Sequence, residues 1–404
     1  MPRPGTLSTV AQGVRASVFA RIAQKMSAHR GSALYPLHIG DTHLIPPEEV
    51  RHHPPEEFGA ECYRYGPPAG APELLDALAR KLRAKNGLPW VRIENIQVAA
   101  GATHALYAAS RAVLDQGDEV VVAAPYWPLI QGIVQLCGAQ LREVPFYQEL
   151  YRNPGADPRA LLEPHVSAHT VAIYLISPNN PDGKVLGRAQ LERVAELARE
   201  RNLWVLCDEV YEDYLYDGAQ HVSMAALPGM AERTLTAFSF SKSHAMAGMR
   251  LGYVAGPADV IAQTRKICNH TVYSVPLHLQ RGAVRALAHA EGFIAHALDE
   301  HRAAREQAVA TVRAPFFAPQ GASYLFLDLR EYVPPGASDC VPVLERLVEA
   351  GVLLAPGEAF GDGFALYARM CFTALPRDRL REAIARLNQV LEDAARSRSA
   401  AVAR

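Results

Sequence analysis

The alternation of apolar, strand-like stretches with helix-like stretches between residues 96 and 255 constrains the fold more than any other feature of this sequence. The apolar stretches are short and rich in β-branched residues, as buried strands are, and they read IQVAA, EVVVAA, TVAIYLI, LWVLCD and TLTAFS. Stretches with helical periodicity, such as GATHALYAASRAVL and RAQLERVAELARERN, lie between them. This alternation predicts an α/β fold whose large domain holds a mostly parallel, doubly wound sheet.

The pattern changes at about residue 276, which indicates a second, smaller domain. Helical periodicity continues over residues 280–314, and shorter strand-like stretches follow, among them GASYLFLDL and ALYARMCFTAL. A chain of 404 residues also exceeds one ordinary domain. We therefore expect a small α+β domain with an antiparallel sheet, connected through a long interdomain helix.

Three parts follow from this change of pattern. We expect residues 1–45 to form an N-terminal arm and part of the small domain, residues 46–275 to form the large domain, and residues 276–404 to form the interdomain helix and the rest of the small domain. A short strand is expected over residues 37–39. Gly40 ends it, either as a plain turn residue or as a point of close approach to a ligand.

Polar side chains stand where the predicted strands end, which is where open α/β sheets bind ligands. Asp208 ends an apolar strand, and a buried carboxylate there needs a partner, such as a protonated ring nitrogen or an arginine. Tyr211 follows three residues later and can donate to the same ligand. Asn180 lies in the turn SPNNPDG, although turn composition alone explains that segment. Trp127 is either a ring that stacks on a planar ligand or a core tryptophan.

Two further segments suit an anion. Gly101, Ala102 and Thr103 form a tight turn before a helix, so their backbone N–H groups favour a negative charge, with Thr103 as a plain N-cap the alternative. The segment SFSK ends in Lys242, and Arg250 follows eight residues later.

The side chains of this second segment carry complementary chemistry. A lysine at the buried end of a strand has a depressed pKa and attacks aldehydes. Ser239, Ser241 and Arg250 form a set of donors suited to a phosphate. An aldehyde and a phosphate on one ligand suggest pyridoxal phosphate (PLP). The alternative is a solvated loop lysine and an ordinary surface arginine.

Composition excludes several classes of function. The formal net charge is -1, so nothing indicates a nucleic-acid or membrane surface. No apolar run is long enough to span a bilayer. The six cysteines are scattered singly without CxxC spacing, so neither a metal site nor a redox motif is expected. We expect a cytoplasmic protein.

Taken together, the motifs make the chain similar to a known family over nearly its whole length. In order, they are Y-x4-G-x-P-E-L from Tyr65, GAT, PYW, NNPDG, DEVY, SFSK with its arginine, and YARMCF with Arg369. This set resembles the fold-type I PLP-dependent aminotransferases of class I/II. The resemblance implies a transaminase that moves the amino group of an α-amino acid to a 2-oxo acid, with PLP bound by the large domain over residues 46–275.

The resemblance also implies roles for the residues around the cofactor ring. Lys242 matches the lysine that forms a Schiff base with PLP and then shuttles the substrate proton. Asp208 matches the carboxylate that keeps the ring nitrogen protonated. Tyr211 and Asn180 match the pair that binds the phenolic oxygen, and Trp127 matches the ring that stacks on the cofactor.

The remaining matches concern the phosphate, the substrate and a second subunit. The phosphate would be held by Gly101, Ala102, Thr103, Ser239, Ser241 and Arg250. Tyr65 matches a tyrosine that reaches the phosphate in the neighbouring subunit, which implies a homodimer with shared active sites. Arg369 matches the arginine that binds the substrate α-carboxylate, with Gly40 and Asn180 nearby.

Some positions depart from the family pattern. Met249 stands where many relatives have a tryptophan, and His104 stands where relatives often have Gly or Gln. Residues 269–280 contain no clear second arginine, which argues against a dedicated aspartate enzyme, although a loop elsewhere in the chain can supply one. His270, Tyr273 and His278 either line a side-chain pocket or lie at an interface. The same motifs also serve PLP-dependent lyases and cyclases of specialised amino-acid metabolism. A PLP-binding regulator is a third reading, and the lack of a basic excess disfavours it.

Overall fold

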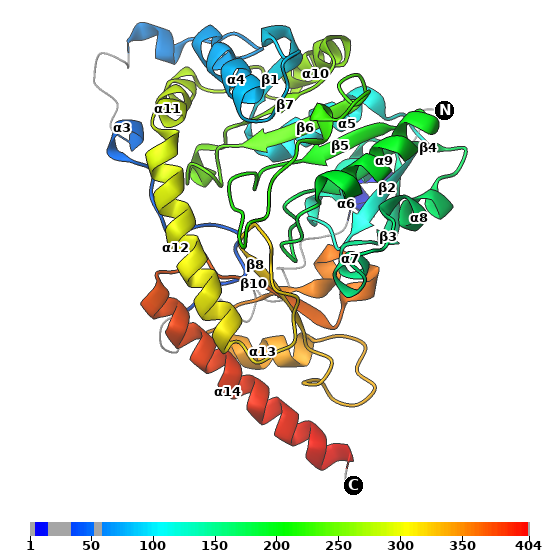
Figure 1. Ribbon diagram of the computed structural model, residues 1–404, viewed down its shortest axis with the longest axis vertical. Coiled ribbons are helices and arrows are strands. Elements are labelled where there is room, and N and C mark those ends of the chain that lie inside the picture. The colour runs from blue at the N-terminus through cyan, green and yellow to red at the C-terminus, as the bar shows by residue number, and fades with distance from the viewer. Residues whose placement is uncertain (1–4, 15–33, 52–58, 403–404) are drawn as a thin grey trace.

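The computed structural model describes residues 5–14, 34–51 and 59–402, and these are organised around two β-sheets (Figure 1). The larger sheet has seven strands in the order β1-β7-β6-β5-β4-β2-β3. Its strands are β1 (Ile96–Ala99), β2 (Glu119–Ala124), β3 (Gln140–Pro145), β4 (Thr170–Ile176), β5 (Trp204–Asp208), β6 (Thr234–Ser239) and β7 (Gly252–Ala255).

Strand direction in the larger sheet confirms the predicted α/β class. The neighbours β3, β2, β4, β5 and β6 pair in parallel, and β7 runs antiparallel to both β6 and β1. Every residue of β2 is buried, as expected where helices cover both faces of a parallel sheet. Strand β3 lies at the edge, and its exposure alternates along the chain.

Helices pack around the larger sheet (Figure 1). They are α3 (Glu48–Arg51), α4 (Pro72–Ala84), α5 (Gly101–Val113), α6 (Leu129–Leu136), α7 (Tyr147–Arg152), α8 (Pro158–Leu162), α9 (Arg188–Glu200), α10 (Ala258–Thr271) and α11 (Leu277–Ala288). Helix α4 begins at Pro72, because proline tolerates the first helical position. Its apolar face, which includes Leu74, Leu78 and Leu82, is buried.

The smaller sheet has three antiparallel strands in the order β8-β10-β9, which confirms the predicted small α+β unit. They are β8 (Tyr324–Asp328), β9 (Ala355–Pro356) and β10 (Tyr367–Cys371), and they pack with α12 (Ala290–Thr311), α13 (Val341–Glu349) and α14 (Arg377–Val402). This unit has a hydrophobic core of its own, which includes Leu325, Leu327 and Met370.

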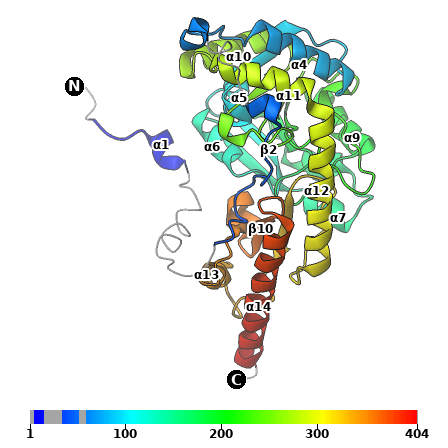
Figure 2. The ribbon, with the colours of Figure 1, turned by 90° about the vertical axis from the view of Figure 1, so that its left-hand side faces the viewer.

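The helix predicted over residues 280–314 is two helices rather than one. The break between α11 and α12 falls at His289, whose backbone leaves helical geometry at φ -110° and ψ 16°. Figure 2 shows α12 running from the larger sheet to the smaller sheet, beside α14. In the described part of the chain, no helix combines the length and the apolar character needed to cross a membrane.

The strand predicted over residues 37–39 is wrong. The β-type contact is made two residues earlier, where Tyr35 forms a parallel bridge with Val352. The chain then turns, and the Leu37 N–H donates back to the Tyr35 carbonyl at 2.9 Å. Of the predicted N-terminal arm, α1 (Thr9–Gly13) is a short helix, and residues 15–33 lie outside the described residues.

Candidate active site

A cavity of about 290 Å³ lies where β4, β5 and β6 end at their carboxyl edges, as predicted for an open α/β sheet. Its volume is at the lower end of the range for small-molecule sites. It is lined by predicted site residues, namely Gly40, Ala102, Thr103, Trp127, Asn180, Asp208, Tyr211, Ser239, Ser241, Lys242, Arg250 and Arg369. The structure therefore brings together residues spread over most of the chain.

Asp208 is a buried carboxyl group with little compensation. It is the last residue of β5, and it accepts long hydrogen bonds from the Tyr174 hydroxyl at 3.4 Å and the Val210 N–H at 3.3 Å. It makes no ion pair with any residue in the described ranges. Burial raises the pKa of Asp208 to about 7. The group is therefore suited to a ligand that brings a protonated nitrogen.

Lys242 follows β6 and projects into the same cavity. Its ammonium group donates to the Gly40 carbonyl, and its own backbone carbonyl accepts from the Tyr214 hydroxyl at 2.6 Å. Burial lowers the pKa of Lys242 below its ordinary value. A larger share of neutral amine makes this lysine a better nucleophile toward an aldehyde.

The candidate anion site lies at the start of α5. Gly101 has φ +81°, and a Cβ atom there would lie 2.5 Å from Nη2 of Arg250. A Cβ atom at Gly252 would lie 2.7 Å from the backbone nitrogen of Ala102. The two glycines therefore let the arginine and the backbone approach closely. The backbone donors at the start of this 13-residue helix favour an anion.

The start of α5 also answers two questions left by the sequence. The N-cap is Ala100 rather than Thr103, so the plain capping role for Thr103 is wrong. The side chain of His104 accepts from the Ala100 N–H at 3.2 Å. His104, which replaces the Gly or Gln of many relatives, therefore stabilises the turn through its side chain. The replacement leaves the cavity lining unchanged.

Arg369 reaches the cavity from β10. Its guanidinium donates to Oδ1 of Asn180 at 2.9 Å and to the His38 carbonyl at 2.7 Å, and it lies over the Tyr324 ring at 4.4 Å from the centroid. Its Nε group is buried and has no hydrogen-bond partner in the described structure. One donor is therefore free for a ligand carboxylate.

Tyr324 belongs to this site, and the sequence reasoning missed it. Its hydroxyl bonds the Tyr211 hydroxyl, and a Cβ atom at Gly40 would lie 2.2 Å from the same oxygen. Tyr324 lines the cavity because β8 pairs with β10, which sets it opposite Cys371. No sequence motif marks this residue. The only signal of a role in the site is that Tyr324 lies in β8, the strand that pairs with the Arg369 strand β10.

Two predicted residues lie outside the cavity lining. Gly101 forms the turn behind it, against Arg250. Tyr65 is 85% exposed and packs edge-on against Tyr273, with ring centroids 4.8 Å apart. The described ranges also contain no group of three His, Cys, Asp or Glu side chains that could hold a metal ion.

The donor set of this cavity fits PLP. The uncompensated Asp208 suits the ring nitrogen, Lys242 suits the aldehyde, and the glycine turn beside Arg250 suits the phosphate. The parallel sheet with this cavity at its carboxyl edge is that of a fold-type I PLP-dependent enzyme.

Comparison with known proteins agrees with this class. The sequence pattern of the family described as aminotransferase class I and II matches residues 36–387. An aspartate aminotransferase from Pyrococcus abyssi is 33% identical over 88% of this chain and 91% of its own length. An arginine–pyruvate transaminase from Pseudomonas aeruginosa is 34% identical over 89% of this chain and 90% of its own length. A solved double mutant of Thermus thermophilus aspartate aminotransferase has a TM-score of 0.88 and 32% identity, covering 96% of this chain and 100% of that one.

The chain belongs to the class I and II aminotransferase family. It is a transaminase that uses PLP to transfer amino groups between amino acids and 2-oxo acids.

Proposed function

We propose that this transaminase takes its amino group from an α-amino acid with a neutral side chain. The observation that carries this proposal is the set of cations in the cavity. Among the described lining residues, these are Lys242, Arg250 and Arg369. Each has a place in the common chemistry, so none of the described lining cations of this subunit remains for a side-chain carboxylate. The nearby lining is apolar and includes Leu129, Ile176 and Val210.

We assign the phosphate and ring contacts as follows. The backbone at Ala102 and Thr103, together with Ser239, Ser241 and Arg250, binds the phosphate. Trp127 lines the same cavity and would stack on the ring. Asn180 and Tyr211 donate to the phenolic oxygen, since Oδ1 of Asn180 already accepts from Arg369 and leaves Nδ2 as donor.

Bound PLP supplies an aldehyde that condenses with amines and a ring that accepts electrons from the substrate. Asp208 would keep the ring nitrogen protonated, because the positive charge on that nitrogen stabilises the ionised form of the buried carboxylate. Lys242 would hold the aldehyde of the cofactor through Nζ and would move the proton at the substrate Cα. Arg369 orients the substrate through its α-carboxylate, beside Gly40.

We further propose a homodimer with shared active sites. Tyr65 carries a family motif yet lies on the surface, 85% exposed, outside its own cavity. A contact with the phosphate in a second subunit accounts for both observations. The exposed Tyr273 beside it suits an interface more than a side-chain pocket.

We also propose the domain division 1–45, 46–275 and 276–404, with PLP bound by the large domain. The two sheets support it, as does the hydrophobic core that the smaller unit has of its own. A cytoplasmic location is proposed because the cysteines are free, five of them buried, as in proteins of reducing compartments.

The test of the donor is a half-reaction followed by the visible absorption of the cofactor. Purified enzyme is mixed with one amino acid and no 2-oxo acid, and then with a 2-oxo acid. We expect alanine, leucine or phenylalanine to change the spectrum faster than aspartate, and a 2-oxo acid to restore it. Fastest change with aspartate contradicts the neutral-donor proposal. Steady release of ammonia without a 2-oxo acid indicates a lyase instead.

A further inference from the structure

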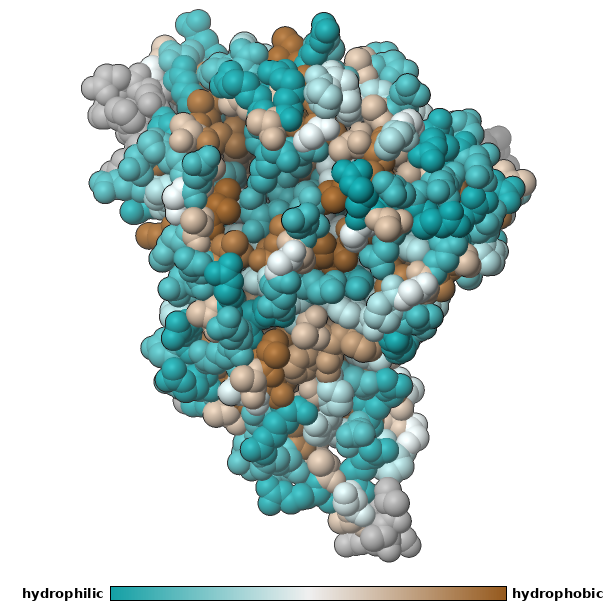
Figure 3. All heavy atoms as spheres, viewed as in Figure 1, coloured by the Kyte–Doolittle hydropathy of each residue, from teal (hydrophilic) through white to brown (hydrophobic). Residues whose placement is uncertain are grey.

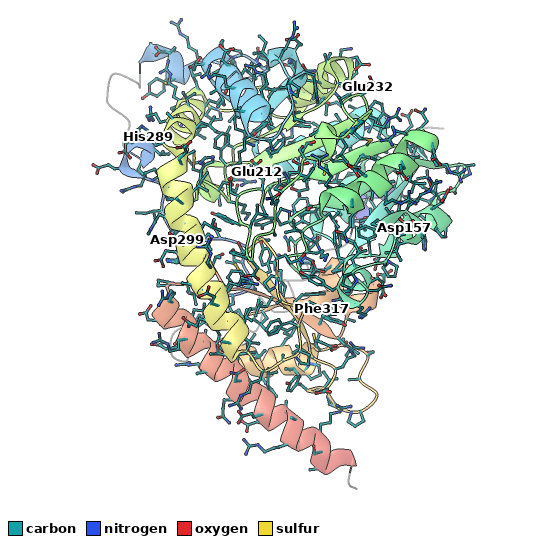
Figure 4. The ribbon with its side chains drawn as sticks, in the orientation of Figure 1. Asp157, Glu212, Glu232, His289, Asp299 and Phe317 are labelled. Carbon is teal, nitrogen blue, oxygen red and sulfur yellow. The ribbon has the colours of Figure 1, made fainter. Side chains whose placement is uncertain are left out.

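A second cavity, of about 690 Å³, lies beside the active site and is not used by the chemistry described above. Helix α4, the ends of α11 and α12 where they meet, and the chain segment 239–244 enclose it. Ser239 lines both cavities, whereas Ser243 and His244, directly after Lys242, line only the second. Figure 4 shows Glu212, a lining residue, in the region between β6 and the α11–α12 junction at His289.

The walls of this cavity are mainly apolar. Phe240 and Tyr253 contribute rings whose centroids lie 6.2 Å apart, and Val284, Leu287 and Ile294 contribute aliphatic side chains. Figure 3 shows hydrophobic surface among hydrophilic surface on this face of the molecule. Protein interiors are otherwise closely packed, and a space of this size with apolar walls is typical of a small-molecule site.

A buried polar group faces into this space. His244 is only 8% exposed, and its ring makes no hydrogen bond with any residue in the described structure. Burial lowers the pKa of His244 to about 4, so the imidazole is neutral near pH 7 and offers one donor and one acceptor. The ring nitrogens of His244 are therefore accessible from the cavity, where a ligand hydroxyl can bond them.

Two charged groups of the lining, Arg80 and Glu291, have no ion pair with any described residue. Lys81 pairs with Glu212, and Lys85 pairs with Asp213. Glu291 lies in the first turn of α12, where the helix dipole stabilises a carboxylate. The exposed Arg80 has no ion pair or hydrogen bond with any described residue. Because the helix dipole compensates Glu291, the charge left without compensation is the cation Arg80 at the solvent end, opposite a neutral polar group at the buried end.

We propose that this second cavity binds a small aromatic carboxylic acid that carries a hydroxyl group. The ring packs against the apolar wall formed by Phe240 and Tyr253, the hydroxyl bonds His244, and the carboxylate pairs with Arg80. The inference does not depend on the identity of the amino donor. It also places the ligand against the segment that holds Lys242.

The probe is 3-(4-hydroxyphenyl)propanoate, added to the PLP-loaded enzyme and followed by titration calorimetry. We expect saturable binding that is lost in Ala77→Phe, which fills the cavity. In Arg80→Gln, the affinity should fall up to about fivefold, the effect of an exposed ion pair. The matched control is Arg381→Gln, an exposed arginine of α14 remote from the cavity, which should bind as the native enzyme does.

Related probes test each contact separately. 3-Phenylpropanoate lacks the hydroxyl and should bind more weakly than the hydroxylated probe, and the two should bind alike in His244→Phe. 3-(4-Hydroxyphenyl)propan-1-ol and tyramine lack the carboxylate and should bind more weakly. Stronger binding of tyramine overturns the assignment of a carboxylate ligand.

A carboxylate can also enter the active site through Arg369, so the titration is repeated with Arg369→Ala. Binding that survives this change and is lost in Ala77→Phe supports the second site. Binding lost in Arg369→Ala and unchanged in Ala77→Phe belongs to the active site and overturns the proposal. The absence of saturable heat with the native enzyme overturns it as well.

Discussion

At the scale of single residues, the active site concentrates polar groups that the fold leaves incompletely paired. Asp208 lacks a cation, and Nε of Arg369 lacks an acceptor in the described structure. Such groups cost stability, since buried polar atoms are normally paired. The cost is understandable at a ligand site because the ligand supplies the missing partner.

Lys242→Ala should abolish transamination while PLP still binds without a covalent link. The chain would lose the amine that holds the aldehyde and moves the proton, whereas the phosphate and ring contacts remain. Reduction with borohydride followed by mass spectrometry should attach the cofactor to the native protein and not to the variant. The exposed Lys266 gives the control, and Lys266→Ala should retain both the covalent label and the activity. Turnover by the Lys242 variant would contradict the assigned role.

Asp208→Asn should stabilise the cofactor-free protein at neutral pH. Between pH 3.8 and about pH 7, the folded protein retains a proton on Asp208 that the unfolded chain has released. The free energy of unfolding therefore falls as the pH rises through this window, by on the order of 4 kcal/mol in total. Asparagine removes this dependence and should also weaken PLP binding.

Urea unfolding of the cofactor-free native and Asp208→Asn proteins measures this effect directly. The difference in unfolding free energy should be small near pH 4 and should grow toward pH 8. A variant that is equally destabilised at both pH values would show that Asp208 is a structural residue rather than a ligand group.

At the scale of elements, the active site depends on how α5 begins. The backbone turns at Gly101 with φ +81°, and Arg250, itself at φ +49°, closes against the glycine from the segment before β7. The candidate anion site therefore forms where the start of α5 and the segment before β7 meet. Neither segment forms it alone.

Gly101→Ala should lower the affinity for PLP, because the new Cβ atom would displace the Arg250 guanidinium. The strain of a positive φ would also lower stability, so a control for that strain is needed. Gly117 has φ +93° and nothing within 4 Å of a Cβ atom, so Gly117→Ala carries the strain alone. Equilibrium dialysis with PLP should show weakened binding in the first variant only. Equal affinities would contradict the role of this turn in phosphate binding.

At the scale of the whole molecule, the site joins distant parts of the chain. Gly40 comes from the N-terminal part, Lys242 from the larger sheet, and Arg369 from the smaller sheet. Helix α12 connects the two sheets, and its His301 bonds Thr42 near Gly40 at 3.0 Å. Small relative movements of the two sheets would therefore alter the substrate-binding contacts.

Two inactive variants should complement each other if active sites are shared between subunits. A mixture of Tyr65→Ala and Lys242→Ala, unfolded and refolded together, forms hybrid dimers with one site that has both native residues. Activity of the mixture should exceed the average of the two variants measured separately. The neighbouring Tyr63 is similarly exposed at 83%, and Tyr63→Ala serves as the control for Tyr65→Ala. Activity at the simple average would contradict a shared site.

Much of the fold and most of the site could be predicted from the sequence. The strands of the larger sheet are apolar, and each ends near a polar residue such as Asp208 or Asn180, so the site follows from local patterns. The break at His289 was not predicted, because helical periodicity continues across it and only packing against two different sheets separates α11 from α12.

The sequence by itself determined the class of fold, the polar groups at the strand ends and the chemistry of Lys242, because these depend on residue type and short-range periodicity. The tertiary structure alone decided that the Tyr324 hydroxyl bonds the Tyr211 hydroxyl. It also decided that residue 40 must lack a side chain, because a Cβ atom there would collide with Tyr324. It also decided that a second cavity lies behind the lysine segment. The physical reason is that such contacts join residues far apart in the chain, and their distances depend on how whole elements pack.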